Sequence, residues 1–202
     1  MKAWGQPPEN STMKTIILAL CVVLGWARLC PAASVPVDIE HSSLTIRVFK
    51  SGFFSGFAHD HEISAPLFSG SVDGDTLAVE LQFDARKLTV LDPEASPNDR
   101  AKIQETMLSD KVLDAQRFPE IRFVARQVKR TEPNTYSVEG ELTLHGTTHT
   151  IAVPVSFADG HYSGSVKLKQ TDFGIEPIRI FGGSVKVKDV VEIGFDIVLQ
   201  GK

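Results

Sequence analysis

The chain has 202 residues, of which 42% are hydrophobic, and a formal net charge of −4. This length predicts one domain of ordinary size, or one domain with a short extra segment. The sequence has no block of basic residues of the kind that binds phosphate backbones, so we expect no nucleic-acid partner.

The N-terminal segment has the order of features of a secretory signal peptide. Lys14 precedes an apolar run, residues 15–27, and small residues follow it. We predict a signal peptide over residues 1–33, with cleavage between Ala32 and Val35; residues 1–12 could be an upstream extension. The apolar run is shorter than the roughly 20 residues of a membrane span. A retained N-terminal anchor is the alternative.

The expected mature domain comprises residues 34–202, and we expect it in the periplasm or secreted, without a stable membrane span. It has no cysteine, because Cys21 and Cys30 both lie in the predicted signal peptide. A disulfide, a thiol nucleophile and a cysteine metal site are therefore excluded from it, and its stability must come from a hydrophobic core.

The first half of this domain has the period of two that is typical of strands. Apolar and polar residues alternate over residues 44–49 and 77–84. A short edge-like strand containing Pro36 precedes them, and residues 58–63 and 67–72 are further strand candidates. Residues 51–58 are rich in Gly and Phe and could form a loop, a bulged strand or a helical turn.

One helix is expected in the middle of the chain. Ser96 or Asn98 can cap it, and Pro97 suits its first turn. Ile103, Met107 and Leu108 would then share one helical face, after which Pro119 favours an extended chain.

A hairpin over residues 136–157 is the most regular pattern in the sequence. Its apolar residues share one parity on each strand, and Gly146 lies in a short link that suits a turn with positive φ. Two more strands are expected over residues 162–168 and 191–199. We count eight or nine strands and one short helix. This predicts an all-β fold whose long strands close into an antiparallel barrel, with a two-layer sandwich as the alternative.

The most distinct local motif is the pair His59-x-His61. Residues two apart share a face of a strand, so both rings could reach one metal ion, with His41, His145, His149 or His161 as a further ligand. A polar rim with Asp60 as a hydrogen-bond acceptor is the alternative. The sequence has no catalytic serine elbow and no phosphate-binding glycine loop. We therefore expect no enzyme activity and no cofactor.

The apolar stripes predict either a filled core or an apolar cavity inside the barrel, since an eight-stranded barrel can hold side chains or one small ligand. Gly140 and Gly164 have inward parity and are expected to leave space there. Residues 51–58 and the helix could cover an open end.

Four segments in series resemble the YceI-like family. They are Val37-Asp38-x-x-His41-Ser42, Gln116-x-Phe118-Pro119-x-Ile121-x-Phe123, Gly140-x-Leu142-Thr143-Leu144-x-Gly146 and Thr171-Asp172-Phe173-Gly174-Ile175. The resemblance implies an extended antiparallel eight-stranded lipocalin-like barrel with one short helical insertion, exported and without catalytic activity. It also implies a long apolar ligand in the interior, an isoprenoid or a similar lipid. Here the family's polar-basic segment before the helix is acidic and rich in Pro (residues 91–99).

Inward apolar positions that match the family's ligand-lining ones are the predicted binding residues: Phe123, Leu142, Leu144, Val153, Val155, Phe173 and Phe195. We therefore expect an exported protein that sequesters or carries a long-chain isoprenoid or similar lipid. The alternatives are a small metal-binding or redox accessory protein using His59 and His61, and a filled barrel acting through its outer face. The sequence predicts no oligomeric state.

Overall fold

A computed structural model describes residues 34–51, 60–73, 78–180 and 185–201. Strands in the first half are β1 (Ser34–Pro36), β2 (Ser43–Ser51), β3 (His61–Ser64), β4 (Leu67–Asp73), β5 (Val79–Asp84) and β6 (Thr89–Val90). Strands in the second half are β7 (Glu120–Glu132), β8 (Thr135–Leu144), β9 (Thr147–Ala158), β10 (His161–Lys169), β11 (Arg179–Ile180) and β12 (Val185–Val198). The helical elements are α1 (Pro97–Leu108) and the 3₁₀ turns η2 (Ala85–Lys87) and η3 (Gln170–Phe173). The predicted signal peptide lies outside the described residues.

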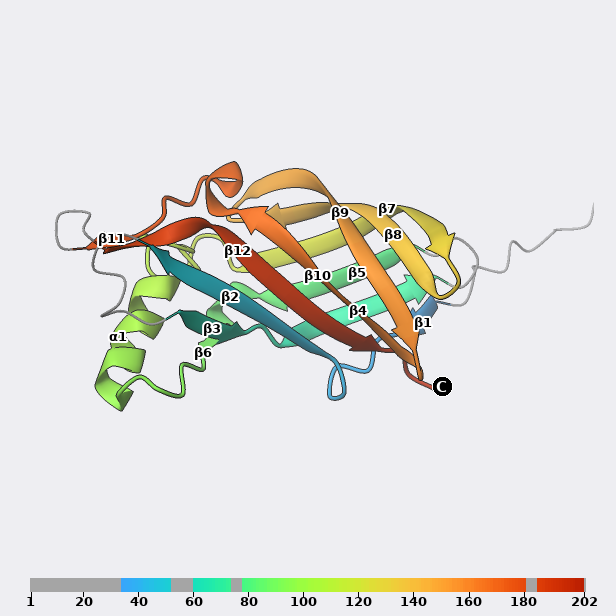
Figure 1. Ribbon diagram of the computed structural model, residues 1–202, viewed down its shortest axis with the longest axis horizontal. Coiled ribbons are helices and arrows are strands. Elements are labelled where there is room, and N and C mark those ends of the chain that lie inside the picture. Colours follow the sequence, from blue (N-terminus) through green and yellow to red (C-terminus); the bar gives the residue numbers. More distant parts are fainter. Residues whose placement is uncertain (1–33, 52–59, 74–77, 181–184, 202) are drawn as a thin grey trace, which may run out of the picture. The chain divides into compact units, whose positions relative to one another are not determined.

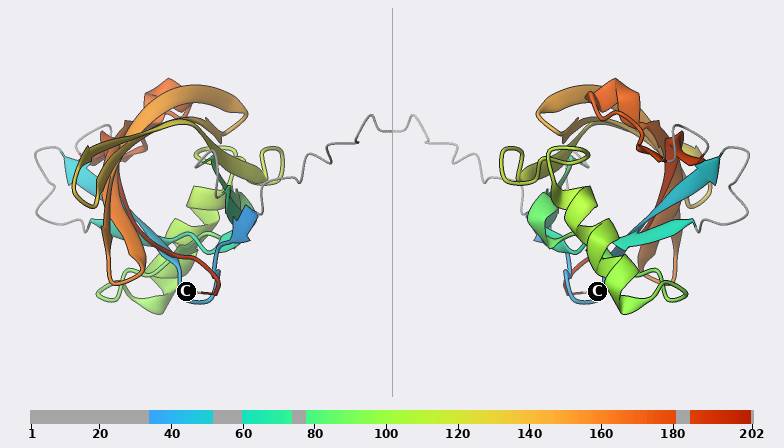
Figure 2. Two further views of the ribbon diagram at one scale, coloured as in Figure 1. Left: turned by 90° about the vertical axis from the view of Figure 1, so that its right-hand side faces the viewer. Right: turned by 90° about the vertical axis from the view of Figure 1, so that its left-hand side faces the viewer.

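The strands form one antiparallel sheet that closes on itself. Its order is β1-β4-β5-β7-β8-β9-β10-β12-β2-β3-β6, with β11 paired to β12. β3 pairs with β2 and β4 pairs with β5. Because only Ala65 and Pro66 separate β3 from β4, this bent segment joins the two halves of the sheet. Viewed from either end, the ribbons form a ring (Figure 2).

A second closure lies beside β1. Val37 bridges Leu199, and the N–H of Asp38 donates to the carbonyl of Val198 at 2.8 Å. The backbone groups at this edge are thereby paired, which removes a free sheet edge.

The predicted all-β antiparallel barrel with one short helical insertion is confirmed, but the number of strands differs from eight. Twelve strands form in the described residues. β1, β6 and β11 are pairings of only two or three residues, and Pro66, which has no N–H to donate, falls between β3 and β4. When β3 and β4 are counted as one bent strand and the three short strands are set aside, eight strands make up the wall.

The hairpin turns follow from residues that tolerate positive φ. His145 and Gly146 have φ of 51° and 72°, and Asp159 and Gly160 have φ of 51° and 88°. Two consecutive residues with positive φ make the type I′ turn that matches the twist of the flanking strands. The predicted hairpin is therefore confirmed, with Leu144 paired to Thr147 across its turn.

The predicted helix is confirmed as α1. The N–H of Asp99 donates to the hydroxyl of Ser96 at 3.2 Å, and Pro97 is the first helical residue. Met107 is buried, and Ile103 and Leu108 pack against the same hydrophobic cluster. The helix lies at one end of the barrel, seen on the left in Figure 1 and in front in the right-hand view of Figure 2. It therefore covers part of that end, as the sequence suggested; residues 52–59 lie outside the described residues.

Candidate functional site

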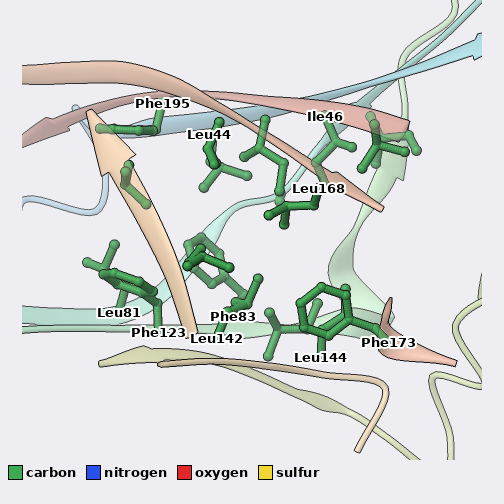
Figure 3. A pocket seen from close by; sticks show the side chains of 18 of the residues that line it. Leu44, Ile46, Leu81, Phe83, Phe123, Leu142, Leu144, Leu168, Phe173 and Phe195 are labelled. Atoms are coloured by element: carbon green, nitrogen blue, oxygen red, sulfur yellow. The ribbon is translucent and has the colours of Figure 1, made fainter. Parts of the chain in front are cut away.

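The barrel encloses an apolar cavity of about 340 Å³. This volume falls in the lower part of the range of small-molecule pockets, about 300–1,000 Å³. All but four of its lining residues are apolar, and the exceptions are Tyr136, Tyr162, Lys169 and Gln170. In Figure 3, Phe195 and Leu44 face Leu81 and Phe123 across the interior, and Phe173 lies beside Leu144. The described barrel is therefore hollow rather than fully packed.

Strand periodicity explains why this lining is apolar. β2 contributes Leu44, Ile46 and Val48, whereas Thr45 and Arg47, at the other parity, do not line the cavity. Side chains on a strand alternate between faces, so every second residue points inward. The polar partners of these stripes form the outer wall.

The structure places all seven predicted binding residues in this lining. Phe123 comes from β7, Leu142 and Leu144 from β8, Val153 and Val155 from β9, Phe173 from η3 and Phe195 from β12. They gather on several walls of the same cavity. Their contact with a ligand remains a prediction.

Several lining residues were missed because they do not lie on predicted strands. Met107 on α1 and Val112 and Leu113 after it line the cavity near its α1 end, together with Leu88. The apolar face of the helix is the only signal in the sequence that points to this group. The alternation over residues 44–48 and 79–83 also indicates inward-facing apolar positions, and these residues line the cavity as well.

The expectation that Gly140 and Gly164 leave empty space is wrong. A Cβ on Gly140 would lie 2.6 Å from Cζ of Phe123, and one on Gly164 would lie 2.8 Å from Cζ of Phe195. Each glycine instead lets an aromatic ring lie against the strand, which is a known way to stabilise glycine in a sheet. The cavity lies beyond the rings rather than at the glycines.

We expect Gly140→Ala to destabilise the protein by about 1–3 kcal/mol, because the new methyl group would overlap the Phe123 ring and overpack the wall. Gly194→Ala on β12 is the matched control, since a Cβ there meets no atom within 4 Å. Alanine at that site should be neutral or slightly stabilising. Urea unfolding measures both changes, and equal effects would contradict the packing described.

Polar side chains attach α1 to the barrel. The N–H of Val90 donates to Oε1 of Gln104 and Nε2 of Gln104 donates to the carbonyl of Leu88, both at 2.8 Å. The amide thereby satisfies two backbone groups of the β6 edge. Asp92, only 4% exposed, accepts from the N–H of Glu62 at 2.8 Å and contacts Nδ1 of His61 at 2.6 Å. The segment before the helix is therefore held to β3 by a buried carboxylate.

The described histidines have separate interaction partners, except that His145 and His149 both contact Phe173. His41 contacts Asp38, His161 contacts Asp196, and His145 and His149 contact Phe173. His59 lies outside the described residues. Within the described part of the chain, no group of three or more His, Cys, Asp or Glu side chains is placed to hold a metal ion. Metal binding by His59 and His61 therefore stays a hypothesis.

η3 is anchored to β12 by an ionised carboxylate. The N–H and the hydroxyl of Thr171 donate to Asp189 at 2.9 and 2.8 Å, and Nε2 of Gln170 donates to the carbonyl of Lys188 at 2.9 Å. The pKa of Asp189 is lowered chiefly by the backbone N–H of Thr171, with a smaller contribution from its hydroxyl. Hydrogen bonds that favour the charged form have this effect. The anchor is therefore formed with an ionised carboxylate at neutral pH.

Among the helices in the described part of the chain, none combines the length and the apolar character needed to cross a membrane.

A model of the YceI-like domain matches residues 36–199. The chain belongs to the YceI-like family. A UPF0312 protein of Pseudomonas putida is 29% identical over 172 residues, which cover 79% of this chain and 85% of the relative. A UPF0312 protein of Pseudomonas savastanoi is 32% identical over 115 residues, covering 46% of this chain and 57% of the relative. The chain thus aligns with little more than half the length of that relative.

A solved structure supports the YceI-like fold independently. The crystal structure of Burkholderia cenocepacia BcnA matches with a TM-score of 0.62 at 20% identity, covering 80% of this chain and 98% of that one.

Proposed function

We propose that this YceI-like protein is a non-enzymatic, exported binding protein that sequesters or carries a long-chain isoprenoid or a similar apolar lipid inside the barrel. The observation that carries the proposal is the cavity of about 340 Å³ with only four polar residues in its lining. An apolar ligand gains from leaving water in such a site, whereas a polar ligand would find few hydrogen-bond partners.

The expected affinity comes from apolar burial. Each buried CH₂ contributes about 0.8 kcal/mol, so a dozen such groups give roughly 10 kcal/mol before the costs of association. Selectivity would then depend on the length and width of the chain more than on polar contacts. Export is supported by the basic, apolar and small residues in order within residues 1–33.

Native mass spectrometry and organic extraction test the ligand. We expect the protein, purified from cells that express the full chain, to carry an extractable apolar species of defined mass. After delipidation it should take up geranylgeraniol with micromolar or tighter affinity. A protein that is free of lipid as purified, and that takes up neither geranylgeraniol nor palmitate, would contradict the proposal.

Cell fractionation tests export separately. We expect the protein outside the cytoplasm, with an N-terminus between Ala32 and Val35. A cytoplasmic protein that retains residues 1–33 would contradict export without affecting lipid binding.

A further inference from the structure

The wall of the barrel has a seam between β9 and β10. These strands pair over only three positions, of which Ser163 with Ser156 is the last. β10 nevertheless continues to Lys169, and over its whole length it pairs with β12 on its other side. The ribbons of β9 and β10 diverge toward the end that carries η3 (Figure 1). Six residues of β10, from Gly164 to Lys169, thus have no ladder partner on β9.

A proline explains where the ladder stops. The N–H of Phe157 donates to the carbonyl of Asn134 at 2.8 Å, so this residue of β9 faces the β8 side. Backbone groups of successive residues face opposite neighbours in an antiparallel sheet. Pro154, three residues earlier, therefore directs its nitrogen toward β10. Proline has no hydrogen to donate, so the bond that residue 154 would donate to β10 is lost. Its carbonyl still faces β10, since a Cβ on Gly164 would overlap the carbonyl oxygen of Pro154.

η3 fills this seam. Its residue Phe173 is only 1% exposed and lines the cavity. On the β9 side, Nδ1 of His145 lies 3.2 Å from the carbonyl of Phe173, and the His149 ring packs on the Phe173 ring at 5.2 Å. On the β12 side, Asp189 and the carbonyl of Lys188 hold Thr171 and Gln170. A small number of side-chain contacts thus replaces a continuous strand ladder here, and the hydrogen bonds to β12 among them are exposed.

The polar residues of the lining lie at its two ends. Tyr162 is at the start of β10 and Lys169 at its end, so the two are about 23 Å apart at the usual rise per strand residue. Tyr136 lies near the paired end of β9, opposite Val155. Lys169 is the last residue of β10 and Gln170 is the first residue of η3, so both lie at the unpaired end of the seam. The charged group of the lining is therefore next to the seam.

We propose that the seam between β9 and β10 is the portal of the cavity, that η3 is its plug, and that the ligand is a single-chain amphiphile whose polar head stays beside Lys169 and Gln170. This inference rests on the proposed function. Release of the plug requires η3 to leave β12, because the contacts of Thr171 and Gln170 hold it there. The apolar chain then passes between the two strands without unfolding a ladder.

A reversible cross-link of η3 to β12 tests the portal. The variant is Thr171→Cys with Asp189→Cys, in a full chain whose Cys21 and Cys30 are replaced by serine; the Thr171 hydroxyl and the Asp189 carboxylate already lie 2.8 Å apart. The probe is cis-parinaric acid, whose fluorescence reports uptake and release into phosphatidylcholine vesicles. We expect the oxidised variant to exchange the probe at least about tenfold more slowly than the reduced one, as when a closed lid limits exchange.

Two single variants separate the portal from the α1 end. Asp189→Ala, which removes two hydrogen bonds to a charged group, should accelerate exchange by about tenfold or more. Gln104→Ala, which loosens α1 from β6, should leave the rate nearly unchanged. Faster exchange in Gln104→Ala, together with no response to the cross-link or to Asp189→Ala, would overturn the portal and assign entry to the α1 end.

The orientation of the amphiphile is tested with stearate that carries a nitroxide beside its carboxylate. We expect the nitroxide to broaden the amide NMR signals of Lys169 and Gln170 more strongly than that of Tyr136. The reverse order would overturn the placement of the head. If the parent protein takes up neither cis-parinaric acid nor geranylgeraniol, both the proposed function and the portal fail. Normal uptake with rates insensitive to η3 overturns the portal alone.

Discussion

Leu144→Glu should reduce uptake of geranylgeraniol by more than about 100-fold, because a carboxylate placed in an apolar cavity without a partner is costly to desolvate. Leu144 ends β8 and lies beside Phe173 in the cavity lining (Figure 3). Fluorescence competition against cis-parinaric acid measures the loss. Circular dichroism and urea unfolding establish that the variant still folds.

The matched control for this change is Thr143→Glu. Thr143 is the preceding residue of β8, has the opposite parity, and pairs with Arg122 of β7. A glutamate there would face a guanidinium on the outer wall, and uptake should stay within about twofold, since exposed charge pairs contribute little. Val153→Phe keeps the lining apolar while occupying space, and it should shift the preference toward shorter chains. Full uptake by Leu144→Glu would show that the barrel interior is not the binding site.

Phe173→Ala should destabilise the protein by about 3–5 kcal/mol, which is typical of removing a fully buried aromatic ring. Phe173 is 1% exposed and is the largest side chain that is fully buried among the described residues. A loss of this size is a large part of the 5–15 kcal/mol that stabilises an ordinary domain. The midpoint of urea unfolding should therefore fall markedly.

Phe68→Ala on β4 is the control for ring removal. Phe68 is 63% exposed, so its substitution should change stability by no more than about 0.5 kcal/mol. Equal losses at the two positions would contradict the view that η3 seals the interior with a buried ring.

The barrel could be predicted because its signals are local. The period of two over residues 44–49 and 136–157 fixes which side chains point inward, and Gly146 and Gly160 mark turns that only a few residue types tolerate. Six of the seven predicted lining residues have the inward parity of such an alternation, whereas Phe173 lies in η3 and was predicted from the resemblance to the family alone. The number of strands was harder to predict, because pairings of two or three residues, such as β6 and β11, depend on tertiary neighbours rather than on periodicity.

The features that depend on three-dimensional packing could not be predicted. Whether Gly140 leaves a void is decided by the ring of Phe123, seventeen positions earlier in the sequence. The buried contact of Asp92 with His61 joins residues 31 positions apart, and no spacing rule connects them. Pro154 can be read from the sequence. Its effect on the β9–β10 ladder depends on whether its nitrogen points toward β8 or toward β10, which only the structure shows.

The closure beside β1 has a consequence for how the barrel assembles. The hydroxyl of Ser42 accepts from the N–H of Val198 at 2.9 Å, across 156 positions of sequence. Bringing together two segments so far apart in the sequence costs roughly 4–5 kcal/mol of loop-closure entropy, before any contact offsets it. β12 is also the shared partner of β2 and β10. Until its last long strand has been synthesised, the chain can form its local hairpins but cannot enclose an interior.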